Sequence, residues 1–141
     1  MNIFLDTCSL FKLYHREVGS EDLERLFSSL SISAVFLSDL TKIEFTSTIW
    51  KKVRTREITE MQAQTTLALF EADFDKYSFI VTDSLVIEQA RLLVSKYGTQ
   101  GLRTLDSIQL STAISLRENV GLFCTADKLL LSLLEAENLP V

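Results

Sequence analysis

Ile3-Phe4-Leu5-Asp6 is the stretch that decides the fold: three apolar residues followed directly by an acid. A short apolar run without polar alternation is typical of a strand buried on both faces of a sheet. We expect a helix right after it, over Leu10–His15. A strand followed by a helix is the unit from which parallel sheets are built, and the rest of the chain repeats this unit.

Further short apolar runs recur along the chain, separated by segments long enough to form helices. They predict three more buried strands and one short edge strand, where a proline is tolerated. The buried strands are expected at Ala34–Leu37, Phe79–Val81 and Leu122–Cys124, and the edge strand at Leu139–Val141.

The segments between the strands have helical apolar spacing and recognisable ends. Ser20, followed by two acids, is typical of a helix start, and Thr59 with Gln62 forms a capping-box pattern. Asp83 is a suitable cap for a helix that Gly98 ends as its C′ residue. The helices expected on these grounds are Ser20–Leu30, Asp39–Arg54, Thr59–Tyr77, Asp83–Tyr97, Asp106–Leu116 and Lys128–Ala136.

Uniformly apolar strands alternating with helices predict an α/β fold, a three-layer α/β/α sandwich with a central, mainly parallel sheet. The 141 residues match the usual size of one domain, so we expect residues 1–141 to form a single domain. A hydrophobic content of 47% excludes a disordered chain.

Charge and residue usage exclude several classes of function. Lys and Arg number 14 against 19 Asp and Glu, and the net charge of −5 argues against a broad basic nucleic-acid surface. Two separated cysteines, Cys8 and Cys124, and the single His15 argue against a zinc site. We expect both cysteines to be buried as small apolar residues and His15 to lie at the surface. The absence of a long apolar run and of a signal-like start predicts a cytoplasmic protein that does not enter membranes.

Four acids stand where a parallel sheet places its ligand site. Asp6 follows the first strand and Asp127 the fourth, while Glu44 and Asp106 lie near the starts of two helices. Residues just past the carboxyl ends of parallel strands meet in one crevice. Clustered carboxylates repel one another, and with no His or Cys cluster available they favour a hard cation, Mg²⁺ or Mn²⁺. Such an ion commonly serves phosphodiester chemistry.

A purely structural role is the alternative for each acid taken singly. Asp106 and Asp127 beside helix starts are often only caps or partners of the helix dipole. Glu44 is harder to explain as part of a solvated face, because Ile43 and Phe45 flank it.

Four segments of the chain resemble the PIN domain family, particularly the VapC-like toxin ribonucleases. They come in the family's order and at similar separations, and together they span essentially the whole chain: Leu5–Tyr14, Leu40–Phe45, Leu102–Leu110 and Thr125–Leu130. The resemblance implies an endoribonuclease, dependent on Mg²⁺ or Mn²⁺, that is the toxin of a toxin–antitoxin pair. It also implies an RNA substrate, a cognate antitoxin bound by the early helices, and a homodimer.

By matched position, the resemblance makes Asp6, Glu44, Asp106 and Asp127 the catalytic, metal-holding acids. Thr7 and Ser9 lie beside this quartet, and Thr125 is expected to orient water or phosphate through its hydroxyl. The expected reaction is in-line attack of an activated water on an RNA phosphodiester. Cys8 departs from the family pattern, which often has Ser or Asn there, and a thiol is the weaker hydrogen-bond partner.

Basic residues near the acids are the candidate substrate contacts. The strongest cluster is Lys51, Lys52, Arg54 and Arg56, which is either a solvated helix end or a rim that contacts RNA phosphates. Arg103 is either a phosphate contact or a partner for a neighbouring acid.

Two other functions remain as alternatives to the nuclease. One is another metal-dependent phosphodiesterase or phosphatase, which Asp6-Thr7-Cys8 disfavours because it lacks the Asp-x-Asp that a haloacid-dehalogenase-type enzyme needs. The other is a PIN-like module that binds RNA or protein without turnover.

Overall fold

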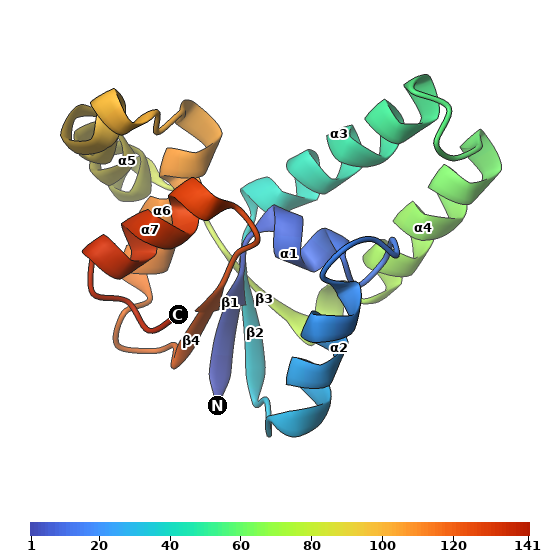
Figure 1. Ribbon diagram of the computed structural model, residues 1–141, viewed down its shortest axis with the longest axis horizontal. Coiled ribbons are helices and arrows are strands. Elements are labelled where there is room, and N and C mark those ends of the chain that lie inside the picture. The colour runs from blue at the N-terminus through green and yellow to red at the C-terminus, as the bar shows by residue number, and fades with distance from the viewer.

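Four parallel strands form one sheet at the centre of the molecule (Figure 1). The computed structural model describes all 141 residues, and the order across the sheet is β3-β2-β1-β4. The strands are β1 (Asn2–Leu5), β2 (Ala34–Ser38), β3 (Tyr77–Ile80) and β4 (Leu122–Cys124). Every pairing in the sheet is parallel, so the predicted sheet is confirmed.

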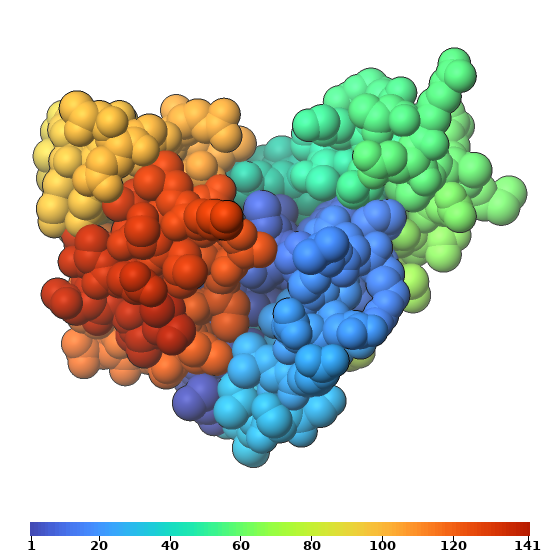
Figure 2. All heavy atoms as spheres, in the orientation of Figure 1, coloured from blue at the N-terminus to red at the C-terminus, as the bar shows by residue number.

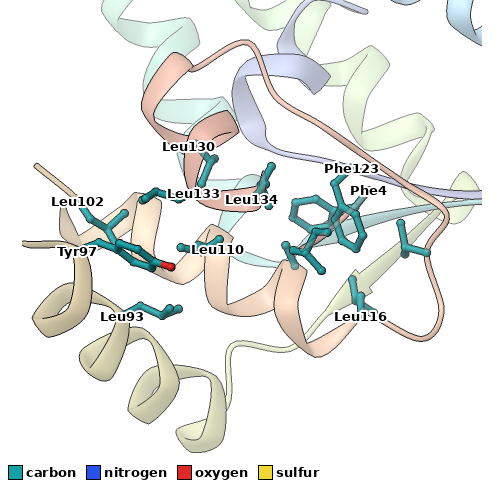
Figure 3. Packing of buried hydrophobic residues seen from close by; sticks show 13 residues of the cluster. Phe4, Leu93, Tyr97, Leu102, Leu110, Leu116, Phe123, Leu130, Leu133 and Leu134 are labelled. Atoms are coloured by element: carbon teal, nitrogen blue, oxygen red, sulfur yellow. The ribbon is translucent and has the colours of Figure 1, made fainter. Parts of the chain in front are cut away.

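Side chains of the central strand alternate between two hydrophobic cores, as strand geometry requires. Ile3 and Leu5 pack into one core, and Phe4 packs into the other, whose residues Figure 3 shows. Helices cover both faces of the sheet, which confirms the three-layer α/β/α architecture (Figure 1). The first core lies under α1 (Thr7–Phe11), α2 (Ser20–Ser29), α3 (Leu40–Arg54) and α4 (Glu60–Ala72), and the second under α5 (Ser84–Tyr97), α6 (Thr104–Ser115) and α7 (Lys128–Ala136).

The helices near the amino terminus begin at other residues than the sequence predicts. The helix expected over Leu10–His15 is α1, which starts at Thr7 because the Asp6 side chain caps it by accepting a hydrogen bond from the Ser9 amide. Ser20 is the first residue of α2 and not its cap, since its hydroxyl instead donates to the carbonyl of Lys12.

Two further helix boundaries differ from prediction, whereas α5 ends at Tyr97 as predicted and only the conformation of Gly98 differs. The helix expected to reach Tyr77 ends at Ala72, and Tyr77 begins β3 after a short 3₁₀ turn over Phe74–Lys76. Gly98 is right-handed and starts a 3₁₀ turn, Gly98–Gln100; the left-handed glycine is Gly101, with φ of 97°. The helix α6 begins at Thr104, so that Asp106 lies within its first turn.

The carboxyl-terminal segment does not form the expected edge strand. Its one hydrogen bond to β4 runs from the Phe123 amide to the carbonyl of Pro140, at 2.8 Å. Pro140 has no N–H with which to continue a ladder, and this limits the pairing. The bounds predicted for β4 and α7, the capping box of Thr59 with Gln62, and the Asp83 cap are confirmed. No helix is both long and apolar enough to span a bilayer.

Candidate active site

The carboxyl ends of β1 and β4 lie side by side, and an acid follows each strand. Asp6 comes directly after β1, is only 4% exposed, and is joined to β4 by a hydrogen bond from its amide to the Cys124 carbonyl. Its Oδ1 accepts from the Ser9 amide at 2.9 Å, and its Oδ2 accepts from the Thr125 hydroxyl. The first predicted acid is thus a buried carboxylate held from both sides.

Thr125 links this carboxylate to the second acid. While its hydroxyl donates to Asp6, it also accepts from the Asp127 amide at 3.0 Å. Asp127 caps α7, because its Oδ1 accepts from the Leu130 amide at 2.8 Å. The expected role of Thr125 toward water or phosphate stays a prediction, since its proton is directed at Asp6 here.

Glu44 approaches the same end of the sheet from α3 and is held through one oxygen. Its Oε1 accepts from the Thr7 hydroxyl at 2.8 Å and from the Gln109 amide nitrogen, also at 2.8 Å. Gln109 was not among the residues that the sequence pointed to. The one signal for it is its place in α6, three residues after Asp106, which puts both on one side of the helix.

Asp106 is half-buried in the first turn of α6, and burial is the main cause that raises its pKa. The negative charge of Asp127 raises that pKa further, whereas Arg103 lowers it. Arg103 is exposed and forms no ion pair, so its charge acts on Asp106 from a distance. The pKa of Asp6 is also raised, mainly by burial, although the bonds from Thr125 and Ser9 oppose the rise.

The charges of all four acids act on one side chain, Cys8. Burial raises the pKa of the Cys8 thiol to about 11, and the charges of Asp6, Asp127, Glu44 and Asp106 all add to the rise. Cys8 is exposed as a whole residue, so the expectation that it is buried is wrong; Cys124 is half-buried. The buried Ser9, next in sequence, supplies the amide that holds Asp6.

The four acids do not form a metal coordination sphere in this structure. No three carboxylate, thiol or imidazole groups lie close enough to share one metal ion. None of the four acids forms an ion pair, although ion pairs to other acids occur across the surface. Oxygen donors left without a protein cation, two of them with raised pKa values, are the donor chemistry that suits Mg²⁺ or Mn²⁺.

A cleft of about 330 Å³ has Asp127, alone of the four acids, in its lining, together with Thr7, Cys8, Lys12 and Lys52 among others. The Lys52 ammonium is paired with Glu57 at 2.8 Å, and its side chain is 19% exposed. Lys51, its neighbour in sequence, is exposed and does not line the cleft. Figure 2 shows that the surface is hollowed between the amino-terminal helices and the carboxyl-terminal part of the chain.

Comparison with known proteins agrees with this arrangement. The PIN domain model matches residues 3–133, a span that includes all four acids. The chain belongs to the PIN domain family. No curated protein matches the sequence significantly.

Two solved structures resemble this PIN domain over nearly its whole length. One is VapC20 of Mycobacterium tuberculosis, described as a sarcin-ricin-loop-cleaving toxin, with a TM-score of 0.71, 14% identity, and coverage of 93% of this chain and 94% of that one. The other is VapBC2 of Rickettsia felis, bound to a DNA fragment from its promoter, with a TM-score of 0.65, 18% identity, and coverage of 99% and 96%. At these identities the likeness is one of fold.

Proposed function

We propose that this PIN domain is a metal-dependent endoribonuclease, the toxin of a toxin–antitoxin pair, which hydrolyses RNA phosphodiester bonds in the cytoplasm. The observation that carries the proposal is that Thr125 links Asp6 to Asp127 and that Thr7, next to Asp6, donates to Glu44, while no Lys or Arg is paired to any of the four acids. Mutually repelling carboxylates kept together without a protein cation are explained by a divalent ion. Membership of the PIN family and the likeness to VapC20, described as a sarcin-ricin-loop-cleaving toxin, support the same reaction.

The four acids would hold Mg²⁺ or Mn²⁺. When bound, the ion supplies an activated water and offsets the charge that develops on the phosphate oxygens. Ser9 and Thr125 fix the Asp6 carboxylate, and Thr7 with Gln109 fixes that of Glu44. These donors restrict how the two carboxylates can turn when an ion binds.

The metal requirement gives the first test. The purified protein, incubated with structured RNA and Mn²⁺, is expected to cleave it, and an excess of EDTA is expected to slow cleavage at least about 100-fold. Replenishing Mn²⁺ is expected to restore the rate, as followed on denaturing gels. Cleavage that continues undiminished in EDTA after dialysis would overturn the metal-dependent mechanism.

Of the basic residues that the sequence singles out as substrate contacts, Lys52 is the one that lines the cleft with Asp127. Lys52→Gln is expected to raise KM for RNA about 5- to 10-fold, as one lost phosphate contact is worth roughly 1 kcal/mol. The matched control is Lys51→Gln, which makes the same charge change one residue away and outside the cleft. Equal KM values for the two variants would show that net charge, and not the position of Lys52, matters.

We also propose an antitoxin partner and a homodimer. An apolar cavity of about 380 Å³ lies between α2 and the β4–α7 connection, lined by Leu23, Leu26 and Leu131 among others. It is suited to apolar side chains of a partner segment, and the VapBC2 structure is of a complex from such a pair. Two exposed apolar residues seven positions apart on α5, Leu85 and Leu92, lie on one side of the helix and offer a surface for a second copy.

One observation favours the alternative of a binding module without turnover, namely that no three candidate ligands are within reach of one ion. Calorimetry with Mn²⁺ at neutral pH separates the two functions. The nuclease is expected to bind the ion and to lose that binding in Asp106→Asn, whereas a silent module is expected to show no heat of binding.

A further inference from the structure

Gln109 is the most deeply buried polar side chain in contact with the quartet. It lies on α6, is 3% exposed, and sends its amide nitrogen toward three oxygens. These are the hydroxyls of Thr7 at 3.1 Å and Thr41 at 3.2 Å, and Oε1 of Glu44 at 2.8 Å. The contacts join residues that are 102, 68 and 65 positions apart in sequence, so α1, α3 and α6 meet at this amide.

The carboxylate of Glu44 determines which way the amide faces. A reversed amide would place its carbonyl oxygen against a negatively charged oxygen, whereas the observed orientation places an N–H donor there. The consequence is that the Gln109 carbonyl oxygen is buried without any hydrogen-bond partner. A buried acceptor without a partner lowers the stability of the fold. The arrangement therefore gives Glu44 a hydrogen bond and leaves the Gln109 carbonyl oxygen without one.

The two oxygens of the Glu44 carboxylate differ in their hydrogen-bond partners. Thr7 and Gln109 both donate to Oε1, and Oε2 accepts no hydrogen bond and forms no ion pair. Thr41 is fully buried; its hydroxyl accepts from Gln109 and lies 3.1 Å from that of Thr7, whose single proton goes to Glu44, and it so holds the two donors in place. One carboxylate oxygen is anchored in the protein, and the other has no hydrogen-bond or ion-pair partner.

We propose that Gln109 is a positioning residue of the active site: it fixes the Glu44 carboxylate so that its free oxygen is available to the metal ion. This inference rests on the proposed function. Partners that orient metal ligands commonly contribute 10- to 100-fold to metal affinity. Gln109 is buried, so it acts through Glu44 and does not touch the RNA.

The main test is Gln109→Met, which keeps the length of the side chain and removes its amide. We expect Mn²⁺ affinity, measured by calorimetry, to fall at least about 10-fold and kcat for RNA cleavage to fall similarly, with KM for RNA changed less than about twofold. The matched control is Ser111→Ala on the same helix. Ser111 is 2% exposed and its hydroxyl donates to the Val86 carbonyl, away from the acids, so this variant is expected to bind Mn²⁺ like the wild type.

A double-mutant cycle shows whether Gln109 acts through Glu44. In a Glu44→Gln background, Gln109→Met is expected to cause no further loss of Mn²⁺ affinity. The pair Thr41→Val and Thr41→Ser probes the same cluster with little change of volume: the valine variant is expected to lose affinity and the serine variant, which keeps the hydroxyl, to retain it. This pair decides the matter if Gln109→Met does not fold.

Three results would overturn the positioning role while leaving the nuclease intact. These are an unchanged Mn²⁺ affinity in folded Gln109→Met, an equal loss in Ser111→Ala, or fully additive losses in the cycle with Glu44→Gln. Failure of the proposed function looks different, because the wild-type protein itself would then bind no Mn²⁺ and cleave no RNA, and the positioning role would fall with it.

Discussion

Replacing Asp6 with asparagine is expected to reduce RNA cleavage by roughly 1,000-fold, because removing about 4 kcal/mol of metal-assisted stabilisation of the transition state has that effect on the rate. Asp6 is the most buried of the four acids and is held on both sides, by the Ser9 amide and the Thr125 hydroxyl. Asparagine has the same shape but lacks the charge that a cation needs. Single-turnover cleavage of a labelled RNA at saturating Mn²⁺ measures the loss.

The same substitution is expected to make the metal-free protein more stable at neutral pH. Burial raises the pKa of Asp6, so the folded protein binds more protons than the unfolded chain between the ordinary carboxyl pKa and the raised one. The contribution of Asp6 to the free energy of unfolding therefore falls as pH rises through that interval. The asparagine side chain is uncharged, and we expect a gain of about 1–2 kcal/mol at pH 7, the scale of other gains obtained at functional sites.

Chemical denaturation at two pH values checks this gain. In EDTA, the advantage of Asp6→Asn over the wild type is expected at pH 7 and is expected to shrink toward pH 4, where the carboxyl group becomes protonated. Asp22→Asn serves as the control, because Asp22 is 83% exposed and the charge change is identical; a shift within about 0.5 kcal/mol is expected there. A loss of stability in Asp6→Asn at pH 7 would contradict the view that the charge is uncompensated.

The fold was predictable from the sequence wherever apolar runs are short and bounded by clear signals. Leu122–Cys124 and Lys128–Ala136 have the predicted bounds, because Asp127 between them both ends the strand region and caps the helix. The parallel sheet follows from strands that are apolar on both faces and separated by helices. The link between Asp6 and Asp127 through Thr125 follows from the same topology, since β1 and β4 are parallel and end at one edge.

Local competition between caps explains where the boundaries were wrong. Asp6 caps α1 and starts it three residues before the apolar spacing predicts. The apolar spacing of α4 continues to Tyr77, but Tyr77 belongs to β3. Its hydroxyl bonds to that of Tyr14, and the residue pairs with Val35 in the sheet. A tertiary pairing overrides the local pattern in that case.

Gln109 was not predictable, because its role depends on partners far away in the chain. A glutamine within a helix is an ordinary helix former and is usually solvated. Its burial and its bond to Glu44 exist only once α3 and α6 meet over the sheet. The exposure of Cys8 was not predictable either. Cysteine is among the residues most often buried, so its residue type alone favours burial, whereas Cys8 is exposed.

Replacing Phe4 with alanine is expected to cost about 3–5 kcal/mol of unfolding free energy, the usual range for a buried phenylalanine. Phe4 is 2% exposed and packs against Phe123 of the neighbouring strand, with ring centroids 5.8 Å apart. Its cluster includes Leu110 and Leu130, which lie on the helices that carry or follow Asp106 and Asp127 (Figure 3). Since domains of this size have about 5–15 kcal/mol of stability in total, urea denaturation is expected to reveal a marginal protein.

Phe36→Ala is the matched control, because Phe36 pairs with Phe4 across the sheet and packs against the same core while remaining partly exposed. It leaves a smaller buried cavity, so a loss of about half that of Phe4→Ala is expected. Equal losses would show that the loss of unfolding free energy does not depend on how deeply the side chain is buried.

A Phe4→Ala protein that is partly unfolded is expected to regain stability in Mn²⁺, because the ion binds only the folded form. The double variant Phe4→Ala/Asp6→Asn is expected not to regain it. The core and the site are connected through β1. Phe4 on this strand packs in the core, and Asp6, two residues later, follows the end of the same strand.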